Sequence, residues 1–125
     1  MAKAKVVLGK RPEFLELTVK ADVPEGEAVV KVQYAYRTHT EYGAMMDEVI
    51  GAGSAAKVKD DTVEAIATLT CEQRAAHILK IVKGWDLEFE FTKDSVTGLC
   101  NEYPGLALAI IQRYRDAIVD GRLGN

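Results

Sequence analysis

The chain has 125 residues and a mass of 13.7 kDa, which is the size of one domain. Its 48% apolar and 28% charged residues exclude general disorder, and no apolar run approaches the ~20 residues that span a bilayer. The net charge of −3 disfavours nucleic acid as a ligand, and two cysteines are too few for a disulfide framework. Without the apolar core of a secretory signal near its N-terminus, the sequence predicts one soluble cytoplasmic domain over residues 1–125, with no membrane partner.

Residues 1–37 have the pattern of a β-hairpin region. Apolar and polar residues alternate from Phe14 to Lys20 and again from Val30 to Tyr36, which is the period of a half-buried strand. Pro24-Glu25-Gly26 supplies a turn between the two runs. Before them, residues 1–12 place four basic side chains around Val6-Val7-Leu8 and form either a frayed arm or a short edge strand.

The first helix is predicted over residues 38–50. Thr38 followed three residues later by Glu41 is a capping-box signature for a helix start. The apolar stripe that follows at helical spacing consists of Tyr42, Met45, Met46, Val49 and Ile50. Gly51 and Gly53 are expected to end this helix and to begin a flexible linker over residues 51–60.

Residues 61–121 form the predicted helical region. Two further capping pairs start helices, Asp61 with Glu64 for a short helix to about Leu69, and Thr70 with Gln73 for a helix that ends at Gly84. The alternating segment Trp85–Phe91 then indicates a strand or an extended connection held by aromatic side chains.

Two more helices complete the region. Thr92 is the expected cap of the first, and Pro104 fits the first turn of the second, which Gly121 ends. The sequence therefore predicts an α+β domain, with an N-terminal antiparallel β-hairpin followed by a mainly α-helical bundle of about four to five helices.

The residue types that carry catalysis or bind metals are not spaced as such sites require. His39, His77, Cys71 and Cys100 form no CxxC, HxxxH or HExxH pattern, and both cysteines fall in apolar stripes, where a thiol packs as a small hydrophobe. Gly51-Ala52-Gly53 lacks the sequel of a phosphate-binding loop. We predict no catalytic residue, no metal site and no cofactor, and by elimination a protein-binding module.

Four segments of the second half together resemble the tail assembly chaperones of long-tailed, siphovirus-like bacteriophages and prophages. The segments are Ile81–Asp86, Phe91–Leu99, Tyr103–Leu106 and Ile111–Tyr114, and Glu88-Phe89-Glu90 departs from the turn-forming residues usual in the family. The structural residues of this motif are Trp85, Asp86, Phe91, Leu99, Tyr103 and Pro104.

The resemblance implies a non-enzymatic protein that binds the tape measure protein and keeps it soluble during tail assembly. It also implies a homo-oligomer in the host bacterial cytoplasm that is absent from the mature virion, with the tail-tube protein as a further candidate partner. Such a task needs adaptable apolar contact surface, which indicates Met45, Met46 and Val49 of the first helix, and Ile111 and Tyr114 of the last. Core packing is the competing interpretation of the two methionines.

Two other interpretations stay open at this point. The chain could be a minor tail or tail-completion structural protein of a phage or prophage. It could instead be a small α+β ligand-binding or enzymatic domain, in which His39, His77 or a cysteine converges with carboxylates in one cleft.

Overall fold

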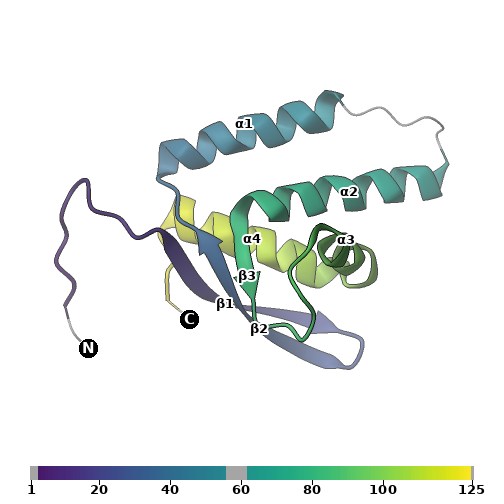
Figure 1. Ribbon diagram of the computed structural model, residues 1–125, viewed down its shortest axis with the longest axis horizontal. Helices are drawn as coiled ribbons and strands as arrows, with labels where there is room; N and C mark the ends of the chain where they lie inside the picture. Colours follow the sequence, from purple (N-terminus) through teal and green to yellow (C-terminus); the bar gives the residue numbers. More distant parts are fainter. Residues whose placement is uncertain (1–2, 56–61, 125) are drawn as a thin grey trace.

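A three-stranded antiparallel sheet and four helices make up the part of the chain that the computed structural model describes, residues 3–55 and 62–124 (Figure 1). The elements in chain order are β1 (Phe14–Val23), β2 (Gly26–Ala35), α1 (His39–Ala55), α2 (Val63–Ile81), β3 (Val82–Trp85), α3 (Lys93–Glu102) and α4 (Pro104–Asp120). The strand order in the sheet is β1-β2-β3. These elements confirm the predicted α+β class, with the hairpin first and the helices after it.

The hairpin forms where the alternation predicted it. Leu17 lies opposite Val32 and Val19 opposite Val30, and these side chains are buried on one face of the sheet. Gly26 takes a φ of 139° directly after the turn, a backbone angle that favours glycine. The described residues before Phe14 belong to no strand and are exposed, so of the two alternatives for residues 1–12 the arm is correct for residues 3–12.

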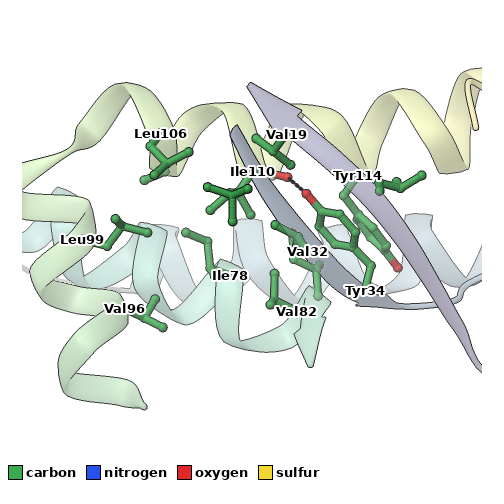
Figure 2. Packing of buried hydrophobic residues seen from close by; sticks show 14 of the residues in the cluster. Val19, Val32, Tyr34, Ile78, Val82, Val96, Leu99, Leu106, Ile110 and Tyr114 are labelled. Atoms are coloured by element: carbon green, nitrogen blue, oxygen red, sulfur yellow. Dashed lines mark hydrogen bonds between the residues drawn. The ribbon is translucent and has the colours of Figure 1, made fainter. Parts of the chain in front are cut away.

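Helix α4 covers the buried face of β1 and β2, and α2 and α3 complete the core (Figures 1 and 2). Tyr34 of β2 stacks on Tyr114 of α4 with ring centroids 5.1 Å apart, and its hydroxyl donates to the carbonyl of Ile110 over 2.7 Å. The pair is fully buried, so each polar group in it needs the partner that it has. Burial raises the pKa of Tyr34 well above its usual value.

Four of the predicted helix ends agree with the structure. The backbone N–H of Thr38 donates to the Glu41 carboxylate over 2.8 Å, and the N–H of Glu41 donates back to Thr38 Oγ1 over 3.3 Å. Thr92 caps α3 by accepting from the N–H of Ser95. Pro104 is the first residue of α4, and Gly121 ends that helix with a φ of 69°.

Three predicted boundaries in the middle of the chain are wrong. Helix α1 continues through Gly51 and Gly53 to Ala55, so residues 51–55 are helical and not linker, and residues 56–61 lie outside the described residues. A glycine inside a helix costs about 1 kcal/mol, which the rest of a helix can offset. The two helices expected between residues 61 and 84 are one helix, α2, capped by Thr62.

Local hydrogen bonding explains the missed continuity of α2. Thr70 does not cap a new helix, because its hydroxyl donates to the Ile66 carbonyl one turn earlier over 2.9 Å. The helix ends at Ile81 and not at Gly84, which lies in β3 opposite Gln33. Of the segment expected to be extended, only Trp85 belongs to a strand, and residues 86–91 are irregular.

The core makes a direct prediction about stability. Ile78 of α2 is fully buried, whereas Ile50 of α1 is 61% exposed. We expect Ile78→Ala to lower the free energy of unfolding by about 2–5 kcal/mol, because it removes buried methyl groups and leaves a cavity. The same change in the control Ile50→Ala should stay within about 0.5 kcal/mol. Urea denaturation measures both, and equal effects would contradict this description of the core.

Candidate functional site

The residues considered for catalysis or metal binding lie apart in the fold. His39 is exposed at the start of α1, and Cys100 is buried in α3. Burial raises the pKa of the Cys100 thiol to about 11, with a further contribution from Cys71, so it is protonated at neutral pH. Within residues 3–55 and 62–124, no three His, Cys, Asp or Glu side chains gather as metal ligands would. In the same part of the chain, no helix combines the length and apolar character of a bilayer span.

The five residues indicated as partner-binding do not share one surface. Met45 and Tyr114 are buried, with 4% and 0% of their surface exposed, and the ring of Tyr42 lies 5.8 Å from that of Tyr114. Met46, Val49 and Ile111 are half-buried. Val49 lines a groove between α1 and α2, whereas Ile111 lines a different hollow between α4 and β1. Only the half-buried three are therefore accessible in this conformation, and the partner-binding role of the set stays a prediction.

Several motif residues of the second half make contacts at the end of β3 and in the segment that follows it. Trp85 lies edge-on to Phe91, with centroids 4.9 Å apart, and its indole N–H donates to the Phe89 carbonyl over 3.1 Å. Asp86 is exposed, but its carboxylate accepts the backbone N–H of Lys31 over 2.9 Å. Of the other motif residues, Leu99 is buried, Phe91 and Tyr103 are half-buried against the core, and Pro104 is exposed at the start of α4.

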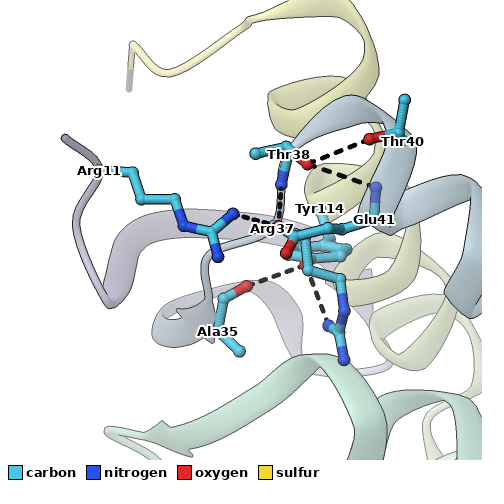
Figure 3. A network of polar contacts seen from close by, with 7 residues as sticks. All are labelled: Arg11, Ala35, Arg37, Thr38, Thr40, Glu41 and Tyr114. Atoms are coloured by element: carbon cyan, nitrogen blue, oxygen red, sulfur yellow. Dashed lines mark hydrogen bonds and ion pairs between the residues drawn. The ribbon is translucent and has the colours of Figure 1, made fainter. Parts of the chain in front are cut away.

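A polar network fixes the point where α1 leaves the sheet (Figure 3). The Tyr114 hydroxyl donates to the Ala35 carbonyl over 2.8 Å and accepts from Arg37 over 3.1 Å. The other terminal nitrogen of Arg37 donates to the carbonyl of Lys80 in the last turn of α2, over 3.1 Å. Arg11 pairs with Glu41, and this hydrogen bond is the main cause that lowers the pKa of the Glu41 carboxyl to about 2.

The groove between α1 and α2 has a volume of about 370 Å³ and mostly apolar walls. Val49, Ala52 and Gly53 of α1 face Leu69, Ala76 and His77 of α2 across it. An ion pair between Lys80 and Glu48, 3.1 Å long, bridges the two helices. Met45 is the only buried side chain among residues 39–53, so α1 contributes little to the core and leaves this space beside α2.

Sequence reasoning missed both this groove and the exposed apolar side chains near it. Ile50, Val63 and Ile66 are 61%, 84% and 48% exposed. The helical spacing of Ile50 predicts that it is buried, and Gly51-Ala52-Gly53 predicts a linker. Small residues within a helix are, however, also suited to the wall of a groove. The hydrophobic periodicity does not predict that a groove separates α1 from α2.

His77 is the unusual polar group of the groove. Its Nε2 is buried and has no hydrogen-bond partner among the described residues. Burial lowers the pKa of His77 below the usual 6.5, and the nearby charge of Arg37 lowers it further. The imidazole is therefore held neutral in the folded protein.

A pH dependence follows from this shift. The unfolded chain takes up a proton on His77 as the pH falls through 6.5, whereas the folded chain takes it up only at lower pH. The contribution to stability is fully present above pH 6.5 and is lost as the pH falls below it. We expect the free energy of unfolding to fall less between about pH 7.5 and 5.5 in His77→Gln than in the wild type. The exposed His39→Gln is the control, and identical pH profiles for both variants would contradict the assignment.

A family of known proteins matches the chain over its whole length. No curated protein and no solved structure matches it. The family model described as phage tail assembly chaperone matches residues 1–125, the whole chain. The chain therefore belongs to the phage tail assembly chaperone family.

Proposed function

We propose that this protein binds the tape measure protein of a phage tail and keeps it soluble until the tail tube assembles around it, without catalysing a reaction. The observation that carries the proposal is membership of the tail assembly chaperone family over the full length of the chain. A chaperone for a long helical client has to offer apolar contacts that are individually weak, so that tube subunits can displace it.

The exposed apolar side chains of the α1–α2 pair meet this requirement. Val63 and Ile66 lie three residues apart, on one face of the first turns of α2. Ile50 lies in the last third of α1, and the end of α1 and the start of α2 lie at the same end of the molecule (Figure 1). We call these three exposed side chains the client strip, and we propose that they contact the apolar stripe of an amphipathic client helix.

The client strip can be tested by co-expression with the tape measure protein of the same phage genome. We expect Ile50→Asp/Ile66→Asp to reduce recovery of soluble complex at least about tenfold, because two desolvated charges would lie in an apolar contact. Val29→Asp on β2, where the valine is 55% exposed, is the matched control and should bind like the wild type. Equal loss in both variants, or none in the double variant, would rule out the strip.

A chaperone that acts in the host cytoplasm leaves the tail when assembly is complete. We therefore expect quantitative mass spectrometry to find the protein in infected or induced cells and not in purified particles. Stoichiometric recovery from washed virions would favour a minor tail or tail-completion protein instead.

A further inference from the structure

The exposed face of α2 continues from the client strip into the α1–α2 groove. Ile66 of the strip is followed at helical spacing by groove residues, namely Leu69, Thr70, Gln73, Ala76, His77 and Lys80. At about 100° per residue, these side chains and Ile66 lie within a sector of about 120° around α2. Lys80 is 14 residues after Ile66, so the face is about 21 Å long. Strip and groove are therefore parts of one surface.

Helix α1 runs beside α2 as the other wall of the groove and is held there by polar side-chain contacts (Figure 1). The ion pair between Glu48 and Lys80 reaches across the groove, as does a 3.5 Å hydrogen bond from the Gln73 amide to the Gly53 carbonyl of α1. The Glu48, Lys80 and Gln73 side chains are exposed, and exposed ion pairs contribute little to stability. Because Met45 alone is buried among residues 39–53, α1 can move away from α2 at little cost in free energy.

The walls of the groove favour a helix as its occupant. An extended segment would bring backbone N–H and C=O groups into an apolar groove, where unpaired groups are costly. Among the described residues, His77 Nε2 is the buried side-chain atom of the groove that has no partner to offer them elsewhere. A helix pairs its own backbone groups, and its rows of side chains pack between the rows of α1 and α2. The lining carries both signs of charge, Glu72 against Arg74 and Lys80, so charge does not select the occupant.

His77 adds a polar requirement to this apolar surface. The imidazole is neutral, so Nε2 is a donor or an acceptor according to the tautomer. A hydroxyl or a carboxamide fits both cases, because each contains a donor and an acceptor. A charged side chain would instead lose its hydration in the groove. The matching helix therefore carries Ser, Thr, Asn or Gln within its apolar stripe.

We propose that one helix of the tape measure protein, about 14 residues long, lies along this face and inserts its apolar stripe between α1 and α2, with a Ser, Thr, Asn or Gln of the stripe hydrogen-bonded to His77 Nε2. The inference rests on the proposed function and adds to it the location, conformation and chemistry of the bound client segment. The client helix replaces the weak polar contacts across the groove, so the net gain for each bound copy is small and the copy stays displaceable.

Photocrosslinking locates the bound segment. The crosslinker p-benzoylphenylalanine takes the place of Ala76 or Ala52, one on each wall of the groove. Its control position is Ala67, nine residues before Ala76 and so on the opposite side of α2. Each protein is co-expressed with the tape measure protein of the same phage genome and irradiated. We expect both groove positions to crosslink one client segment with apolar residues three and four apart and a Ser, Thr, Asn or Gln among them, and the control to give at least about tenfold less product.

Substitutions test the same site through recovery of soluble complex. Ala76→Arg places a charge in the groove and should reduce recovery at least about tenfold, whereas Ala67→Arg should bind like the wild type. His77→Leu leaves the polar group of the client unpaired and should reduce recovery at least about fivefold. His77→Gln keeps a donor and an acceptor and should reduce it less. Circular dichroism checks that each variant is folded.

The outcomes separate this inference from the proposed function. A wild type that forms no complex with the tape measure protein would overturn both. A wild-type complex with unchanged recovery in Ala76→Arg or in His77→Leu would overturn the inference alone. So would crosslinking from the Ala67 position at the level of the groove positions.

Discussion

The buried contact between Tyr34 and Tyr114 is the interaction on which the arrangement of the elements depends. The stacked rings hold α4 against β2, and the two hydroxyls bond to backbone carbonyls at opposite sides of that contact. Because Arg37 also bonds to Tyr114 and to the Lys80 carbonyl near the end of α2, the same cluster connects the start of α1 to the end of α2. The tyrosine pair contributes buried apolar area, and its two hydroxyl hydrogen bonds also fix the orientation of α4 relative to β2. An aliphatic pair could supply the apolar area but not the hydrogen bonds.

Helix α1 is attached to that junction at its start and has little burial beyond it. Tyr42 reaches the tyrosine cluster and Met45 enters the core, but most of the later side chains of α1 are exposed or half-buried. Most helices in proteins owe their stability to tertiary packing of an apolar face. A helix with so narrow a buried face is stabilised little in this way. The fold thus keeps its core in the sheet, α2, α3 and α4, and leaves the side of α1 next to α2 available for contacts.

Signals that act within a few residues could be read from the sequence, and those that depend on the neighbouring elements could not. The strand alternation and the caps at Thr38, Thr92 and Gly121 are local, so the hairpin and three helix ends were predictable. Thr70 shows the limit of local signals, because threonine can cap a new helix or bond back to the preceding turn. Its choice depends on the packing of α2 as a whole.

The candidate site was less predictable for the same reason. Met45 and Met46 are adjacent in one stripe, yet the first is buried and the second half-buried, because neighbouring helical positions differ by about 100° in direction. Tyr114 belongs to an apolar stripe that predicts burial, and the structure buries it completely, so assigning it to a partner surface conflicted with its own pattern. The groove depends on the distance between two helices, which no periodicity encodes.

The exposed apolar groups of this protein are divided between places with different electrostatic surroundings. Val6 and Leu8 are flanked by lysines, whereas Ile50 follows the carboxylates of α1 and Ile66 follows Glu64. Scattered exposed hydrophobic residues need no explanation, but a partner that binds either site has to match the charge beside it as well as its apolar area. Neighbouring charge therefore gives an apolar contact surface on this domain of 125 residues a preference among partners that apolar area alone would not give.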